Sequence, residues 1–195
     1  MKITKKDFPA LILIDFQKAF EDEEYWGGSR NNPFAEENAM KLLNYWRENK
    51  LPLFHIQHIS VNPEAKHGLN NPGHVFKDML KPLAGEVIIQ KSVNSAFIGT
   101  NLKEQLDQNG IHTVVIAGLT TDHCVSTTTR MSGNFGYDTY IVADATATFG
   151  KKGINGEHYS GETMHLTALA QLNQEFATVV LTQELIEDLE AGAEN

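Results

Sequence analysis

The chain has 195 residues, of which 41% are hydrophobic and 21% charged, and its formal net charge is −9 at pH 7. This length and composition predict one domain with a full hydrophobic core, residues 1–195. The acidic balance argues against nucleic acid as a partner, because phosphate binding needs a basic face.

The compartment is also constrained by the sequence. No apolar run approaches the ~20 residues that a membrane helix needs, and the apolar stretch near the N-terminus is too short for a signal peptide. The chain has 1 cysteine, which excludes an internal disulfide and agrees with a reducing compartment. We therefore expect a cytoplasmic protein that does not bind membranes.

Six short apolar runs predict the strands of a sheet. They are residues 10–15, 52–58, 86–91, 113–118, 139–144 and 177–182. Unbroken β-branched runs of this length are typical of parallel strands that are buried on both faces. Helical patterns lie between them, and strands that alternate with helices predict an α/β fold with three layers, α/β/α.

Capping residues predict where several helices begin. They are Asn32 with Pro33 in the first helical position, Thr100, Asp122 and Ser160. Gly110 is expected to end the helix that Thr100 caps, and the acidic run 183–195 predicts a short helix that frays. Residues 60–85 and 146–159 are expected to be long irregular connections that face a substrate or another subunit.

The residues that end the strands are the first candidates for function, because ligands of parallel sheets bind beyond the carboxyl ends of the strands. Asp15, Lys91 and the turn that leads to Cys124 follow three such strands. Together they would supply a base, a cation and a nucleophile to one crevice. Asp144 also ends a predicted strand, but we expect it to hold the following loop through side-chain to backbone hydrogen bonds.

Cys124 has two interpretations. A lone cysteine is commonly a buried small hydrophobic residue. However, Thr120, Thr121 and Asp122 suit the start of a helix, where the macrodipole and free N–H groups favour a thiolate and can receive an oxyanion. This context favours the nucleophile. Taken singly, Asp15 could cap a loop and Lys91 could reach solvent.

Four histidines within twenty positions suggest a metal site, namely His55, His58, His67 and His74. Side chains three apart on a strand point to opposite faces, so His55 and His58 do not easily share an ion. There is no Asp-x-His or His-x-His pair and no second cysteine. We expect no metal and no cofactor.

Aromatic and polar residues near the strand ends are candidates for binding a small-molecule substrate. They are Phe20, Trp26, His58, Asn94, Phe97 and His123. The aromatic segment that follows Asp15 suits a pocket wall, and a contact with a neighbouring subunit suits it equally.

Three motifs carry a resemblance to a known family. They are LILIDFQ with Asp15, QKSVNSAFIGTNL with Lys91, and AGLTTDHCVSTTTR with Cys124. The chain resembles the isochorismatase-like cysteine hydrolases, which include nicotinamidases, N-carbamoylsarcosine amidase and ureidoacrylate amidohydrolase. The resemblance implies a Rossmann-like parallel sheet with strand order 3-2-1-4-5-6 and a homodimer or homotetramer.

The resemblance also implies roles for individual residues. Asp15, Lys91 and Cys124 would form the catalytic triad. A cis peptide bond would lie between Leu119 and Thr120, and the Thr120 and Cys124 amides would form the oxyanion hole.

Two departures from the family narrow the expected reaction. The segment HIQHIS stands where nicotinamidases carry an Asp-x-His metal site, which argues against nicotinamide as the substrate. True isochorismatases lack the cysteine, which argues against vinyl-ether hydrolysis. We therefore expect a metal-independent hydrolase that cleaves a small-molecule amide-type C–N bond through a cysteine thioester.

Two alternatives stay open. One is an isochorismatase-type vinyl-ether or ester hydrolase that uses Asp15 without covalent catalysis. The other is a non-catalytic binding or redox-sensing protein in which Cys124 is reversibly oxidised.

Overall fold

The computed structural model describes residues 3–192, and its main feature is a parallel sheet of six strands. These are β1 (Ala10–Ile14), β2 (Leu53–His58), β3 (Val87–Lys91), β4 (Thr113–Leu119), β5 (Asp138–Ala147) and β8 (Thr178–Val180). Their order is β3-β2-β1-β4-β5-β8, and all neighbouring pairs are parallel. The predicted α/β fold and the order 3-2-1-4-5-6 are confirmed, with β8 as the sixth strand of this sheet.

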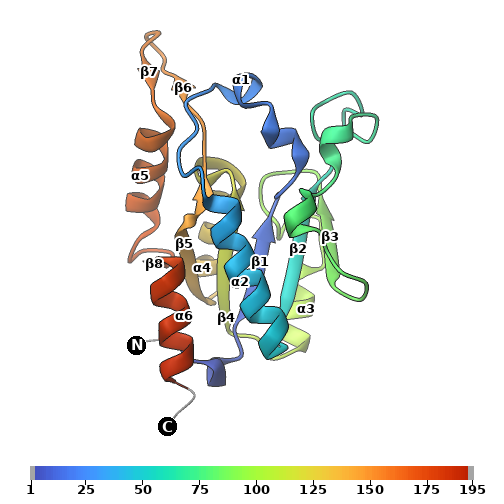
Figure 1. The fold of residues 1–195 in the computed structure, drawn as a ribbon, viewed down its shortest axis with the longest axis vertical. Coiled ribbons are helices and arrows are strands. Elements are labelled where there is room, and N and C mark those ends of the chain that lie inside the picture. The colour runs from blue at the N-terminus through green and yellow to red at the C-terminus, as the bar shows by residue number, and fades with distance from the viewer. Residues whose placement is uncertain (1–2, 193–195) are drawn as a thin grey trace.

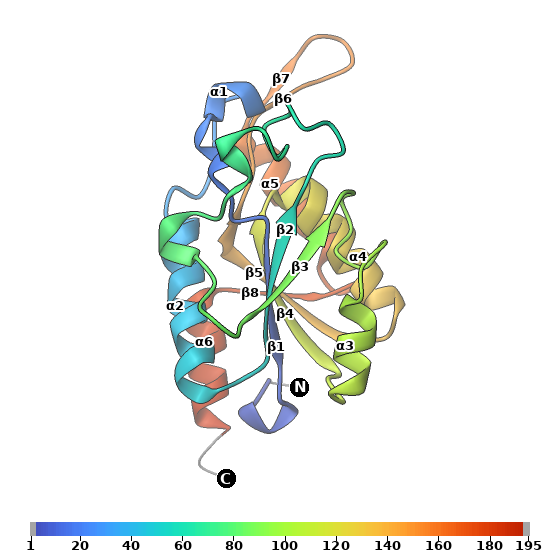
Figure 2. The same ribbon diagram turned by 90° about the vertical axis from the view of Figure 1, so that its right-hand side faces the viewer.

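Helices cover both faces of the sheet and give three layers (Figures 1 and 2). One face carries α2 (Ala35–Asn49) and α6 (Thr182–Ala191), and the other carries α3 (Leu102–Gln108), α4 (Ser126–Asn134) and α5 (Gly161–Leu172). The shorter elements are α1 (Glu23–Trp26), 3-10 turns at Lys5–Asp7, Lys18–Glu21, Pro72–His74 and Asp78–Leu80, and a π-helical turn at Thr121–Val125. Within residues 3–192, no helix is long and apolar enough to cross a membrane.

The central strand β1 explains why the apolar runs are unbroken. Leu11 and Leu13 pack into the cluster beneath α2 and α6. Ile12 and Ile14 point the other way and pack into the cluster beneath α3, α4 and α5. All of them are buried, so alternate side chains contribute to two separate hydrophobic cores.

The predicted helix start at Ser160 is confirmed. The Ser160 hydroxyl accepts a hydrogen bond of 3.1 Å from the Thr163 amide at the start of α5. The start predicted at Thr100 is one residue early, because Asn101 occupies the N-cap position of α3, although the Thr100 hydroxyl accepts a hydrogen bond of 3.3 Å from the Leu102 amide. Gly110, at a φ of +64°, follows the last turn of α3 as expected.

The predicted start of α2 is wrong. The helix begins at Ala35, with Phe34 at the N-cap position. The Asn32 side chain instead donates to the backbone oxygens of Ala143 and Thr146 in β5, at 2.9 and 2.7 Å. It is therefore not available as a cap, and it ties the segment before α2 to the carboxyl end of β5.

The segment 146–159 is more regular than expected. Strand β5 continues to Ala147, and two short strands, β6 (Lys151–Lys152) and β7 (His158–Tyr159), form an antiparallel hairpin. This hairpin rises above the carboxyl end of the sheet (Figure 1).

Asp144 consequently lies within β5, and its expected role is wrong. Its carboxylate accepts hydrogen bonds from the amide and the hydroxyl of Thr182, at 2.8 and 2.7 Å. It therefore holds the start of α6, not the loop that follows it. The acidic C-terminal run is helical to Ala191, and residues 193–195 lie outside the described part of the chain.

Candidate active site

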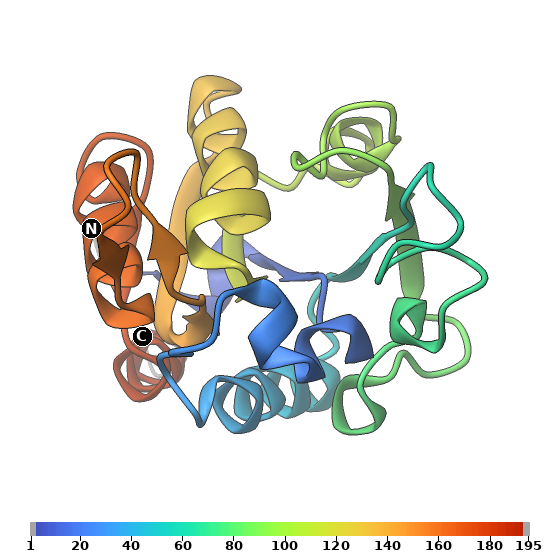
Figure 3. The same cartoon turned by 90° about the horizontal axis from the view of Figure 1, so that it is seen from above.

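Asp15, Lys91 and Cys124 lie at the carboxyl ends of three strands on one side of the sheet, β1, β3 and β4, and this end of the sheet faces the viewer in Figure 3. Asp15 directly follows β1, Lys91 is the last residue of β3, and Cys124 lies in the π-helical turn after β4. His58, at the end of β2, pairs in register with Lys91. The sheet order therefore brings all four residues to one place.

Backbone geometry turns Asp15 toward the other strand ends. Its φ is +54°, a left-handed conformation that aspartate tolerates better than most residues. Its amide donates a hydrogen bond of 3.0 Å to the Ile56 oxygen in β2. On the other side, a Cβ atom at Gly118 would lie 2.3 Å from the Ile14 oxygen, so only glycine lets β4 pack this closely against β1. The peptide bond between Leu119 and Thr120 is cis.

Two side-chain contacts anchor the turn that carries Cys124. The Thr121 hydroxyl is buried and lies 2.8 Å from Nδ1 of His165 on α5. The Asp122 carboxylate accepts a hydrogen bond from the Thr148 hydroxyl. The turn continues directly into α4, so the sulfur is held on a helix that is fixed at its start.

The Lys91 ammonium group joins the other three side chains. Its Nζ donates to Asp15 Oδ2 at 2.6 Å and to Cys124 Sγ at 3.2 Å, and it lies 3.1 Å from His58 Nδ1. The Lys91 side chain is 0% exposed. An ammonium group has three donors, and here each faces one acceptor. His58 Nδ1 therefore carries no proton, and burial together with the Lys91 charge lowers the pKa of His58.

The Cys124 thiol differs from the expectation. The start of a helix was expected to favour the thiolate, but burial raises the pKa of the Cys124 thiol, and the negative charge of Asp15 raises it further. Lys91 acts in the opposite direction and is outweighed. Cys124 is 8% exposed, so the resting site holds a neutral thiol. Beside it, Asp15 Oδ1 is buried and has no hydrogen-bond partner among the described residues.

One set of side chains in this site could hold a metal ion. The ligand atoms of Asp15, His58 and Cys124 all lie within 4.8 Å of one another. The Lys91 ammonium group contacts all three residues, so a cation would have to displace it. The donor set therefore fits a lysine better than a metal.

The predicted substrate-binding residues divide into two groups. His58 belongs to the site, and Phe20 and Trp26 pack on each other with ring centroids 4.8 Å apart. Asn94 and His123 are exposed. Within residues 3–192, no hydrogen bond or ion pair joins either side chain to Asp15, Lys91 or Cys124.

Phe97 is buried in the cluster that also contains Cys124. Its ring packs against Phe135 and Tyr137, with centroids 5.3 and 6.1 Å away. Phe97 therefore belongs to the hydrophobic core between the sheet and helices α3 and α4, the same core that Cys124 contacts.

Two residues near the site were not singled out from the sequence. Gln17 is fully buried and binds the backbone of His58 on both sides, accepting from its amide at 2.8 Å and donating to its oxygen at 2.9 Å. His67 is 7% exposed, and its ring centroid lies 5.2 Å from that of His58. His67 was considered only as a metal ligand, and its place in a loop rich in proline, glycine and asparagine was the available signal.

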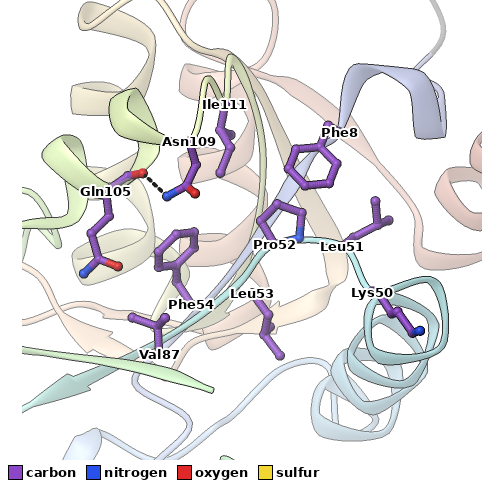
Figure 4. A pocket seen from close by; sticks show the side chains of 10 residues that line it. All are labelled: Phe8, Lys50, Leu51, Pro52, Leu53, Phe54, Val87, Gln105, Asn109 and Ile111. Atoms are coloured by element: carbon purple, nitrogen blue, oxygen red, sulfur yellow. Dashed lines mark hydrogen bonds between the residues drawn. The ribbon is translucent and has the colours of Figure 1, made fainter. Parts of the chain in front are cut away.

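A separate pocket of about 270 Å³ lies at the opposite end of the sheet (Figure 4). It is bounded by residues at the amino-terminal ends of the strands, including Leu53, Val87 and Ile111. Its lining contains no carboxylate, thiol or imidazole. It therefore does not supply the chemistry that gathers around Cys124.

Comparison with known proteins agrees with this geometry. The protein-family model of the isochorismatase domain matches residues 9–184 of the sequence. The chain belongs to the isochorismatase family. It is 53% identical over 179 residues to YrdC, an isochorismatase family protein of Bacillus subtilis, with 92% of this chain and 95% of YrdC covered.

Two further relatives connect the family with hydrolysis. The crystal structure of an isochorismatase-family hydrolase from Chromobacterium violaceum has a TM-score of 0.93 and 38% sequence identity, and 98% of each chain is covered. Maleamate amidohydrolase of Pseudomonas putida is 29% identical over 195 residues, with 93% of this chain and 86% of the relative covered. This isochorismatase-family hydrolase therefore has an amide-cleaving relative along most of its length.

Proposed function

We propose that this hydrolase cleaves an amide-type C–N bond of a small molecule through a thioester on Cys124. The observation that carries the proposal is the contact of one buried ammonium group, Lys91, with both the Asp15 carboxylate and the Cys124 sulfur. The three groups are a base, a cation and a nucleophile, and the cation lies within hydrogen-bonding distance of the other two. The amide-cleaving relative supports the same bond type.

The reaction begins with proton transfer. The thiol proton of Cys124 passes to Asp15, whose Oδ1 has no hydrogen-bond partner among the described residues. The sulfur attacks the substrate carbonyl carbon, and the carbonyl oxygen becomes an oxyanion. The amides of Thr120 and Cys124 bind this oxyanion, and Lys91 balances the charge that moves between Asp15 and Cys124.

The C–N bond then breaks, and the proton on Asp15 passes to the leaving nitrogen. The acyl group remains on the sulfur as a thioester. A water molecule gives a proton to Asp15 as its oxygen attacks the thioester carbon. The sulfur leaves and takes that proton back, which releases a carboxylic acid and restores the resting thiol.

The contacts of Lys91 with Asp15 and Cys124 argue against the two alternative functions for different reasons. Vinyl-ether or ester hydrolysis by Asp15 alone would leave the contact between Lys91 and Cys124 without a purpose. A redox sensor would need the thiol but not the buried pair of Asp15 and Lys91. Amide hydrolysis uses all three groups.

The test is to replace the nucleophile and to trap the intermediate. Cys124→Ala should abolish release of ammonia or amine from a panel of small amides, ureido compounds and lactams. Thr127→Ala, on the same helix, is the matched control and should keep turnover. Because the chain has 1 cysteine, acid-quenched enzyme should show one added acyl mass, at Cys124. Turnover by Cys124→Ala contradicts the proposal.

A further inference from the structure

His67 is a buried histidine whose ring has an unsatisfied nitrogen. Its side chain lies on the segment between β2 and β3, and its Nε2 is buried with no hydrogen-bond partner among the described residues. Buried polar atoms in proteins are nearly always paired, and an unpaired one costs stability. The reaction proposed above gives this nitrogen no part.

The loop holds the His67 ring in place. The His67 oxygen accepts a hydrogen bond of 3.1 Å from the Ser60 amide, and the Gly68 amide donates one of 2.8 Å to the Ala65 oxygen. A Cβ atom at Gly68 would lie 2.2 Å from the Pro63 oxygen. The segment is therefore folded tightly on itself, and the ring position is built by several contacts.

Aromatic rings surround His67 on the active-site side. Its centroid lies 4.9 Å from that of Phe20, 5.4 Å from that of Trp26 and 5.2 Å from that of His58. His58 in turn lies 3.1 Å from Lys91. The His67 ring is thus separated from Lys91 by one ring, that of His58.

The charge around this group of rings favours a neutral ligand. Burial above all, together with the positive charge of Lys91, lowers the pKa of His67 to about 3, so its imidazole is uncharged near neutral pH. The neighbouring cations are already paired, Lys66 with Asp22 and Lys91 with Asp15. A carboxylate beside His67 would lose its hydration without gaining an unpaired cation.

We propose that His67 determines specificity by hydrogen bonding through Nε2 to an uncharged polar atom on the acyl part of the substrate. The substrate class is then neutral amides with a flat unsaturated or aromatic acyl group that carries one hydrogen-bonding atom. This assignment rests on the function proposed for Cys124.

Trp26 is the half-buried ring of this group, and its Nε1 donates to the Ala19 oxygen at 2.8 Å. Its ring packs against that of His67. Because His67 Nε2 is buried, the proposal requires an acyl group to displace a neighbouring ring, and it assigns this movement to Trp26. The chain has 2 tryptophans, and the other, Trp46, is fully buried, so a fluorescence change on binding reports Trp26.

The experiment compares ligands of one shape in proteins that cannot turn them over. Tryptophan fluorescence of Cys124→Ala is titrated with benzamide, with the isomeric pyrimidine carboxamides and with maleamate. We expect at least one pyrimidine carboxamide to bind on the order of 10-fold more tightly than benzamide, and maleamate to bind most weakly. Adding His67→Phe should remove the preference. His67→Gln should restore part of it, because its amide nitrogen can occupy the place of Nε2.

A substitution of Phe20, whose ring packs against His67, separates recognition from packing. Phe20→Leu should weaken benzamide and pyrimidine carboxamide binding equally and keep their ratio. Equal binding of the two ligand types, a ratio unchanged by His67→Phe, tightest binding of maleamate, or no fluorescence response to any of these amides would each overturn the assignment. Thermal melting of each variant confirms that it is folded.

Turnover by the unmodified enzyme distinguishes this failure from failure of the proposed function. If the ligands show His67-dependent binding but are not hydrolysed, the proposed reaction is wrong and the recognition role stands. If the amides are hydrolysed through Cys124 with no preference that depends on His67, the reaction stands and the recognition role is wrong.

Discussion

Replacing His67 with Phe should make the protein less sensitive to acid. Burial and nearby positive charge lower the pKa of His67 to about 3 in the folded protein, whereas an unfolded histidine titrates near 6.5. Because the folded-state pKa is depressed, the neutral ring stabilises the fold above the unfolded pKa, and this stability is lost as pH falls toward the folded pKa. Near pH 4.5 the unfolded chain is protonated at this position and the folded one is not.

The size of the effect follows from the distance to the unfolded pKa. Each pH unit below the unfolded pKa lowers the free energy of unfolding by about 1.4 kcal/mol. About 2 units below it, the wild-type protein has therefore lost roughly 2–3 kcal/mol. His67→Phe lacks this term, so its free energy of unfolding should fall by roughly 2–3 kcal/mol less than that of the wild type between about pH 7.5 and pH 4.5.

Urea denaturation at the two pH values measures this difference. His112→Phe is the matched control, because His112 is exposed in the folded protein, and it should lose as much stability on acidification as the wild type. If His67→Phe loses as much stability as the wild type, the His67 ring is not held neutral by its surroundings, and the reasoning about its charge fails.

Two further substitutions test the geometry of the site. Lys91→Met leaves the buried Asp15 carboxylate without its cation and should cost about 3–5 kcal/mol in urea denaturation, most of it recovered in the double variant with Asp15→Asn; no recovery would show that the pair is not coupled. Gly118→Ala places a methyl group 2.3 Å from the Ile14 oxygen, and it should cost about 1–3 kcal/mol and lower kcat more than it raises KM. Wild-type stability and kcat would show that β1 and β4 do not need this close approach.

The sheet and the position of the site could be predicted because both depend on local pattern. Ile12 and Leu13 are buried on opposite faces of β1, and burial on both faces makes the strand an unbroken apolar run in the sequence. The strand-end rule then places Asp15, Lys91 and Cys124 at one edge, where the structure has them in contact through Lys91.

What could not be predicted depends on partners far away in the chain. Asn32 has the local features of a helix cap, but its amide binds a carbonyl oxygen 111 positions away. The rings around His67 come from two other segments, with Phe20 and Trp26 after β1 and His58 at the end of β2. A local pattern shows which residues can make such contacts, and only the tertiary structure shows which contacts they make.

The pKa of Cys124 was mispredicted for the same reason, and its correction bears on function. The start of a helix acts locally and favours the thiolate, whereas burial depends on the whole fold and disfavours it. Redox-sensing cysteines are exposed and have a low pKa, whereas Cys124 is 8% exposed and its pKa is raised. A neutral buried thiol resists oxidants, and it needs a base in contact to become a nucleophile. In the reaction that we propose, Asp15 is that base, so the raised pKa of the thiol agrees with hydrolysis better than with redox sensing.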